Sequence, residues 1–331
     1  TLNGKLTSQN NSESQAAGQT YDVVIVGAGG SGLAAAARCA ELGLSVVVLE
    51  KQAQPGGTTG IAVGSFTANC TQHQQRVGIM DSLDDHVKDA GKFAAPDVEQ
   101  RNHDALRKPF RSEASVTLDW LAGMGLVFHG PSPEPPNRVP RMHNVVPNAK
   151  AYIAALQSRL FRGGGELACN TAVKEISFEG DRVSGVIAQT PDGELRYYAR
   201  LGVVLAAGDY ANSPELVERF KGKRFSAIEG INPHAVGDGH RLAEQSGAHL
   251  VNMDVTYGPE LRFVPPPGKR DAFAQLLPAT GVRSWLAGKL LPLVPQAVIN
   301  AFIKRLLVTW QHPEERLLKN GAILINRDGQ R

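Results

Sequence analysis

Residues 21–32 read Tyr-Asp-Val-Val-Ile-Val-Gly-Ala-Gly-Gly-Ser-Gly, and this stretch decides the fold. The run YDVVIV is short, apolar and β-branched, which is typical of a strand buried on both faces of a parallel sheet. The Ala-rich run LAAAARCAELG follows it and predicts a helix that ends at Gly43. SVVVLEK then predicts a second buried strand, so residues 21–51 are expected to form one βαβ unit.

The glycines between this strand and helix match the pattern GxGxxG at Gly27, Gly29 and Gly32. The first glycine permits a tight turn, the second lets the backbone approach a pyrophosphate, and the third lets helix and strand pack closely. The free N–H groups at the helix N-terminus attract phosphates. The second strand ends at Glu50, where a carboxylate accepts hydrogen bonds from a ribose diol and repels a phosphorylated ribose. A dinucleotide other than NADP is therefore expected.

A second glycine pair, Gly56-Gly57, follows the acidic strand end and leads into Thr58-Thr59. Such a pair suits a second close approach of the backbone to an extended cofactor, which favours FAD over NAD. On the residues alone, an ordinary loop remains an equal alternative.

The rest of the chain has the apolar periodicity of a mixed α/β protein. Helical spacing predicts helices at 82–93, 114–125, 149–162 and 240–251. Runs joined by Gly-Asp and Asp-Gly turns predict strands within 171–200, LGVVL at 201–205 predicts a third buried strand, and GAILIN at 321–326 predicts a last strand before a turn.

Composition excludes several classes of protein. The formal net charge of the 331 residues is only +3, so nucleic acid is not an expected partner. Three cysteines occur without a CxxC pair, and the nine histidines show no HxxxH or HExxH spacing, so no metal site is expected. No secretory signal and no apolar stretch of about 20 residues is present, which predicts a cytoplasmic location.

Several motifs together resemble the flavoprotein family of fumarate reductases, succinate dehydrogenase flavoprotein subunits and 3-ketosteroid dehydrogenases. They are VVIVGAGGSGLAAA, VVVLEK, GGTTGIAVGSF, VVLAAGDYANSPELVERF, GDGHRLAEQSGAHL and GAILINRDGQR. The resemblance covers most of residues 21–331 and implies FAD as the cofactor. It implies an α/β fold, in which a Rossmann-like FAD-binding domain carries an inserted α+β capping domain for the substrate.

The resemblance assigns cofactor contacts residue by residue. The pyrophosphate loop corresponds to Gly27, Gly29, Gly30 and Gly32, and the ribose acid with its following lysine to Glu50 and Lys51. The second glycine pair and the polar positions after it correspond to Gly56, Gly57, Thr58 and Thr59, and the flavin-side loop to Val63 and Gly64. The adenine-side backbone corresponds to Ala172 or Val173, the return strand to Ala206, Ala207 and Gly208, and a further cofactor contact to Asp238. We expect residues 1–20 to be a disordered leader, 21–240 to form the FAD-binding domain and 241–331 to begin the capping domain.

The chain departs from the family in two places. Dicarboxylate-specific members carry a His-Pro pair where this chain has Val255-Thr256-Tyr257-Gly258-Pro259-Glu260. The family's arginine general acid lies beyond the NRDGQR turn, where this chain stops, so the C-terminal part of the family fold is expected to be missing. Tyr257 is a candidate proton donor, and Glu315 matches a family glutamate, although the arginine expected three residues later is Leu318.

The resemblance implies hydride transfer between FAD and a C–C or C=C bond next to a carbonyl. The missing His-Pro pair favours a bulky hydrophobic substrate, such as a steroid-like ketone, with an electron partner that the sequence does not identify. A small carboxylate substrate, and a flavin-binding subunit without turnover, remain alternatives. A nicotinamide-dependent monooxygenase or disulfide reductase is disfavoured, because the sequence has neither a CxxxxC pair nor a second GxGxxG motif. The apolar segment Leu290–Trp310 is expected to be a helix packed against its own domain, with a lid helix over a hydrophobic substrate or a membrane-surface helix as alternatives.

Overall fold

The computed structural model describes residues 18–256, 318–326 and 328–331. Its main element is a six-stranded mixed sheet in the order β6-β2-β1-β9-β8-β7. Strands β6, β2, β1 and β9 run parallel to one another, and β9, β8 and β7 are joined by antiparallel pairing. The strands are β1 (Gln19–Val26), β2 (Val46–Leu49), β6 (Glu166–Ala168), β7 (Ala172–Glu179), β8 (Arg182–Thr190) and β9 (Gly193–Leu205).

The predicted βαβ unit is confirmed. Helix α1 (Gly30–Glu41) connects β1 to β2, and Ile25 of β1 lies opposite Val48 of β2. Side chains of β1 alternate between two cores, because successive strand residues point to opposite faces. Val23 and Ile25 pack with α1, whereas Val24 and Val26 join the core on the other face.

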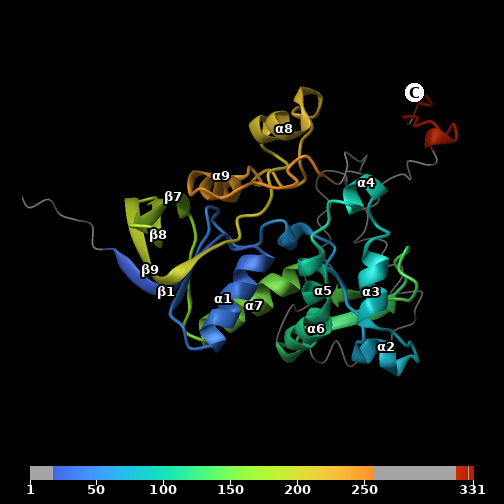
Figure 1. The fold of residues 1–331 in the computed structure, drawn as a ribbon, viewed down its shortest axis with the longest axis horizontal. Helices are drawn as coiled ribbons and strands as arrows, with labels where there is room; N and C mark the ends of the chain where they lie inside the picture. The colour runs from blue at the N-terminus through green and yellow to red at the C-terminus, as the bar shows by residue number, and fades with distance from the viewer. Residues whose placement is uncertain (1–17, 257–317, 327) are drawn as a thin grey trace, which may run out of the picture.

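Helices cover both faces of this sheet. On one face α1 packs against α7 (Lys150–Arg162), which confirms the helix expected at 149–162 (Figure 1). On the other face Leu242 of α9 (Asp238–Gln245) is buried in the core that contains Val24 and Val26. The sheet is therefore enclosed at its centre, as parallel strands require.

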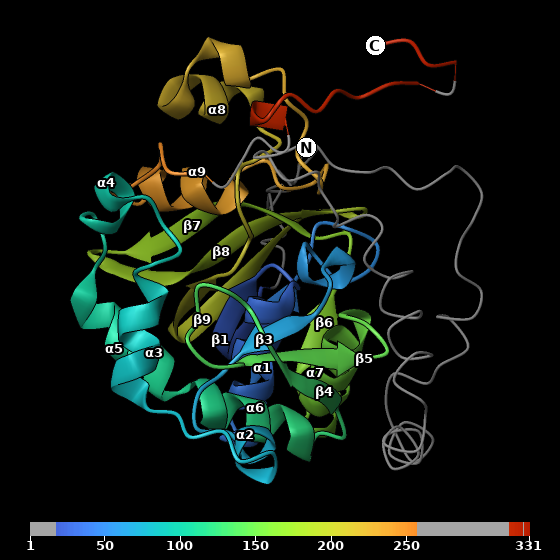
Figure 2. The ribbon, with the colours of Figure 1, turned by 90° about the vertical axis from the view of Figure 1, so that its right-hand side faces the viewer.

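A second, smaller sheet has the antiparallel order β3-β5-β4 and packs Phe128 and Val145 into the core that contains α1 and α7 (Figure 2). Its strands and the accompanying helices are β3 (Ser65–Thr67), α2 (Gln72–Arg76), α3 (Leu83–Ala90), α4 (Pro96–Glu99), α5 (Asp104–Ser112), α6 (Ala114–Gly123), β4 (Val127–Ser132) and β5 (Met142–Val146). Helices α3 and α6 confirm the expectations at 82–93 and 114–125. Charged residues form part of this interior, since Arg141 forms ion pairs with Asp81 and Asp89 and all three side chains are buried.

Residues 209–253 form a small unit that we call the α8–α9 lobe. It contains α8 (Pro214–Lys221), a 3₁₀ turn η2 (Lys223–Phe225) and α9, and α8 stands away from the main sheet (Figure 1). Tyr210, Leu216 and Met253 make its own apolar cluster. The Tyr210 hydroxyl donates a hydrogen bond to the Met253 carbonyl, which ties the two ends of the lobe together.

Two strand expectations are wrong. LGVVL is no separate buried strand, because β9 continues into it from the preceding YYAR run. The pairing of β9 with β1 shifts register at this point, between Tyr21 and Val23 of β1. Leu201 is 63% exposed, and Val204 and Leu205 are each 37% exposed. Residues 321–326 form no strand either, because no strand in the described part of the chain lies beside them to accept their backbone hydrogen bonds.

The turn expected after residue 326 is present, since the Gly329 N–H donates to the Asn326 carbonyl at 3.1 Å. The helix expected at 240–251 ends at Gln245, and Gly247 follows with a φ of +87° that a helix does not allow. The domain boundary expected near residue 240 falls within α9, and the division into domains remains a prediction. The segment Leu290–Trp310 lies outside the described residues.

Candidate functional site

The turn between β1 and α1 is held by glycine. Gly27 has a φ of +102°, and a Cβ atom there would lie 2.5 Å from the Ala206 carbonyl oxygen. A Cβ atom on Gly32 would lie 1.9 Å from the Gly27 carbonyl oxygen, which confirms that the third glycine allows helix and strand to pack closely. Gly29 precedes the helix without a side-chain cap, and Thr59 takes only the Gly30 N–H, so the Ser31 N–H of the first turn remains available to an anion.

The Glu50 carboxylate holds the end of β2 against this turn. Its Oε2 accepts the Ala28 N–H at 2.8 Å, and its Oε1 accepts the Gln52 N–H at 2.9 Å. The residue is only 7% exposed, and its charge adds to burial in raising the pKa of the nearby Cys169 thiol. Each carboxylate oxygen has a further lone pair, so Glu50 can also accept hydrogen bonds from ribose hydroxyls.

The second glycine pair faces the first. A Cβ atom on Gly57 would lie 3.2 Å from the Gly29 Cα atom, and the Gly56 N–H donates to the Ala28 carbonyl at 2.9 Å. Thr59 begins the 3₁₀ turn η1 (Thr59–Ile61), and its hydroxyl accepts the Gly30 N–H at 3.2 Å. Two backbones without side chains therefore lie next to each other at the N-terminus of α1.

A groove of about 1690 Å³ opens where the parallel strands β2, β1 and β9 end, and we call it the strand-end groove. It exceeds the roughly 300–1,000 Å³ of ordinary small-molecule sites, as an extended dinucleotide requires. Ligands of open α/β sheets bind at this edge, outside the carboxyl ends of the strands. The sequence-predicted residues that line it are Gly27, Gly29, Gly30, Glu50, Lys51, Gly56, Gly57, Thr58, Thr59, Ala172, Val173, Ala206, Ala207, Gly208 and Asp238.

Three predicted contacts lie outside this lining. Gly32 packs inside the βαβ unit, and its role is in the close packing described above. Val63 and Gly64 lie beyond the groove, and a Cβ atom on Gly64 would lie 2.6 Å from the Val145 side chain. Their contact with the flavin remains a prediction. The two catalytic candidates, Tyr257 and Glu315, lie outside the described residues.

Sequence reasoning missed part of the groove wall. The first turns of α7 contribute Lys150, Ile153 and Gln157, whereas the sequence predicts only a helix here and assigns it no role in the site. Asn232 and His234 also line the groove, and no motif in the sequence marks them. Such residues come from segments far apart in the chain, so only the folded arrangement reveals them.

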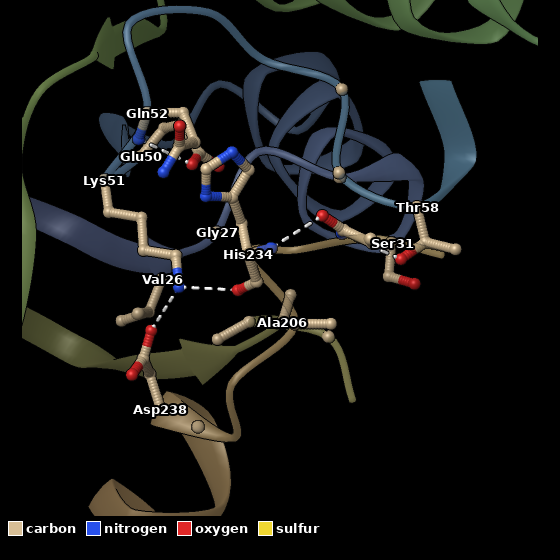
Figure 3. A pocket seen from close by; sticks show the side chains of 18 of the residues that line it. Val26, Gly27, Ser31, Glu50, Lys51, Gln52, Thr58, Ala206, His234 and Asp238 are labelled. Atoms are coloured by element: carbon tan, nitrogen blue, oxygen red, sulfur yellow. Dashed lines mark hydrogen bonds and ion pairs between the residues drawn. The ribbon is translucent and has the colours of Figure 1, made fainter. Parts of the chain in front are cut away.

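Three hydrogen bonds join the two sides of the groove. Lys51 extends from the end of β2 toward α9, where its Nζ donates to Asp238 Oδ2 at 2.6 Å and to the His234 carbonyl at 2.7 Å (Figure 3). Asn232 Nδ2 donates to Thr58 Oγ1 at 3.0 Å nearby. The α8–α9 lobe is thus attached to the segment that follows β2.

These features fit an adenine dinucleotide with a long second half. The glycine turn leaves room for a diphosphate, Glu50 lies where a ribose diol is held, and the groove continues past the second glycine pair. Among the described residues, no three His, Cys, Asp or Glu side chains come together as a metal site would need. None of the described helices has the length and apolar character of a membrane-spanning helix.

Comparison with known proteins agrees with this fit. The family model of the FAD binding domain matches residues 22–270. NADH:fumarate oxidoreductase of Klebsiella pneumoniae (strain 342) is 29% identical over 241 residues, which cover 72% of this chain and 26% of that protein. Urocanate reductase of Eggerthella lenta is 30% identical over 247 residues, covering 70% of this chain and 39% of that protein.

Among solved structures, 3-ketosteroid-Δ4-(5α)-dehydrogenase from Rhodococcus jostii RHA1, in complex with 4-androstene-3,17-dione, superimposes with a TM-score of 0.65. It is 23% identical, and the match covers 76% of this chain and 58% of that one. This likeness concerns the fold. The chain spans less than half the length of the two curated relatives above. The family match over residues 22–270 shows that the chain belongs to the FAD binding domain family.

Proposed function

We propose that this protein is an FAD-dependent oxidoreductase that transfers hydride between the flavin and a C–C or C=C bond next to a carbonyl. The observation that carries the proposal is the strand-end groove, in which two glycine loops and a buried acid converge at the carboxyl ends of parallel strands. Both curated relatives are named as oxidoreductases or reductases. Bound FAD would supply the hydride chemistry that amino-acid side chains lack.

In this proposal the chain's own residues bind and orient the cofactor. The N-terminus of α1 and the turn at Gly27 and Gly29 hold the diphosphate, and Glu50 holds the ribose. Thr58 and Thr59 present hydroxyls on the rim of the same groove. Reduction of a C=C bond also needs a proton at the neighbouring carbon, and we propose Tyr257 as its donor.

We propose a bulky hydrophobic substrate of the steroid-like ketone class. The supporting feature is the stretch Val255–Glu260, which has no His-Pro pair of the kind that grips a dicarboxylate. The apolar sequence around Leu290–Trp310 adds weight to this choice. We also propose that an electron partner exchanges electrons with the flavin, and we assign no residue to its binding.

A second candidate substrate class is a small conjugated carboxylate. The names of the two curated relatives, a fumarate oxidoreductase and a urocanate reductase, favour it. In both classes the reacting C=C bond is activated by an adjacent carbonyl or carboxyl group, so the transfer of hydride and proton is the same.

The test starts with the purified protein, loaded with FAD and reduced anaerobically by dithionite. A steroid enone, fumarate and urocanate are then mixed with it separately. Reoxidation of the flavin is followed by its absorbance at about 450 nm, where oxidised flavins absorb. Reoxidation by the enone supports the hydrophobic class, and reoxidation by a carboxylate replaces it with the second class. A reduced flavin that none of the three compounds reoxidises contradicts both and leaves a flavin-binding subunit.

A further inference from the structure

The ion pair between Lys51 and Asp238 crosses the strand-end groove. Lys51 lies just after β2, and Asp238 is the first residue of α9, so 187 positions separate them in the chain. Their N–O distance is 2.6 Å, and the side chains are 28% and 38% exposed. Lys51 also holds the His234 carbonyl at 2.7 Å, and all three residues line the groove. Figure 3 shows the lysine reaching across to both partners.

A second tie lies along the same seam. Asn232 Nδ2 donates to Thr58 Oγ1 at 3.0 Å, and Asn232 Oδ1 accepts the His234 N–H at 3.0 Å. The stretch from Asn232 to Asp238 is therefore fastened to the β2 end and to the loop of the second glycine pair. The two residues that anchor it on the sheet side, Lys51 and Thr58, both belong to the predicted cofactor contacts.

The lobe behind this stretch is internally bonded. Gly237 donates its N–H to the Asp209 carbonyl at 3.1 Å, and Asn212 donates to the Ala235 carbonyl at 2.9 Å. Arg241 Nη2 pairs with Glu215 at 2.7 Å. A segment with so many internal bonds moves as a unit. Its release from the groove requires the ties at Lys51 and Asn232 to break, together with the packing of Leu242 on the main sheet and the hydrogen bonds between Arg101 and Asn252.

We propose that Lys51 is a positioning residue that latches the α8–α9 lobe across the groove and sets the rate at which FAD leaves. This inference rests on the proposed FAD site. Because Asp238 already neutralises the ammonium group, attraction between Lys51 and the diphosphate is not its main contribution. The latch acts through the lobe, which must open before an extended cofactor can leave.

The test measures FAD release from the loaded protein by stopped flow, using the rise in flavin fluorescence after dilution into a flavin trap. Lys51→Met and Asp238→Asn are each expected to release FAD about fivefold faster than the original protein. The double variant is expected to release FAD no faster than the quicker single variant, because both changes open the same latch. Lys51→Arg keeps the charge and is expected to restore slow release.

Asp238→Asn distinguishes a latch from direct attraction between Lys51 and the diphosphate of FAD. If Lys51 acted mainly on the diphosphate, removal of the nearby carboxylate would make the groove more positive and slow the release of FAD. The matched control is Lys108→Met, which removes a lysine–aspartate pair with Asp84 on exposed helices outside the groove. It is expected to leave the release rate unchanged.

Three outcomes overturn the inference. Unchanged or slower release in Asp238→Asn, or equal acceleration in Lys108→Met, refutes the latch while the FAD site stands. Failure of the unmutated protein to bind FAD refutes the site and the latch together. Thermal unfolding of each variant shows that faster release does not come from a misfolded protein.

Discussion

Asp89 and Arg141 form an ion pair with no exposed surface on either side chain, at 2.7 Å between Oδ2 and Nη1. Asp81 binds the same guanidinium through Nη2 at 2.6 Å. Burial alone raises the pKa of Asp89, but hydrogen bonds from Lys92, Arg138 and Arg141 outweigh it and hold that pKa well below the ordinary value. Ionised groups thus form part of the interior between α3 and β5.

Replacement of Arg141 by methionine leaves Asp81 and Asp89 buried without their shared partner. We expect Arg141→Met to lower the free energy of unfolding by about 3–5 kcal/mol, since breaking a buried pair strands a charge. Urea unfolding followed by circular dichroism measures the change. The control Lys108→Met breaks an exposed pair, with side chains 60% and 72% exposed, and should leave the free energy of unfolding nearly unchanged. Equal losses in the two variants would contradict this account.

Two buried histidines predict a loss of stability in mild acid. Burial, followed by the nearby Arg111 and Arg141 charges, lowers the pKa of His86 to about 4, and burial with the His73 charge lowers that of His143 to about 4. The unfolded chain binds protons at these residues near pH 6.5, so it gains protons before the folded chain does. Stability is therefore full above about pH 6.5 and falls as the pH decreases toward 4.

Each histidine contributes a slope of up to about 1.4 kcal/mol per pH unit within this window. The aspartates of the same cluster, whose pKa values are lowered, add to the loss at the acid end. Unfolding midpoints in urea at pH 7, 6, 5 and 4.5 measure the profile. His86→Gln should flatten it, because one titrating group is gone. A profile that is level down to pH 4.5 would show that these histidines are not buried as neutral rings.

The sequence predicts the βαβ unit well because its signals are local. An apolar run, three glycines and an acid at the next strand end lie within residues 21–51, and each has one physical reading. The helix at 149–162 is equally local, since its apolar spacing suffices. Most of the other groove residues, such as Ala172 and Asp238, are identified only through the resemblance to the flavoprotein family.

The remaining features depend on contacts between distant segments. No sequence motif marks Asp89 and Arg141 as partners, and only the fold brings them together. The partnership of Lys51 with Asp238 spans 187 positions and has no motif. The apolar run 321–326 has strand propensity, but a strand needs a neighbour for its backbone hydrogen bonds, and sequence does not report one.

Glu50→Gln tests the acid that links the segments following β1 and β2. The carboxylate accepts N–H groups from Ala28 and Gln52 on its two oxygens, and an amide presents an NH₂ group to one of them. We expect FAD to bind about tenfold more weakly, because a charged acceptor for the ribose is also lost. Fluorescence titration of the apoprotein with FAD gives the dissociation constant. Unchanged affinity would remove Glu50 from the cofactor site.

Gly32→Ala tests whether close packing of α1 on the turn maintains the site. The added Cβ would lie 1.9 Å from the Gly27 carbonyl oxygen, a backbone atom that moves only if the turn moves. We expect a loss of about 1–3 kcal/mol in stability and a weaker affinity for FAD, because the diphosphate site moves with the turn. Gly123→Ala adds the same methyl group at the exposed end of α6, where nothing lies within 4 Å, and should be neutral or slightly stabilising. Thermal unfolding and FAD titration of both variants measure these effects. If Gly32→Ala matches Gly123→Ala in both stability and affinity for FAD, the glycine at this position serves neither the packing nor the site.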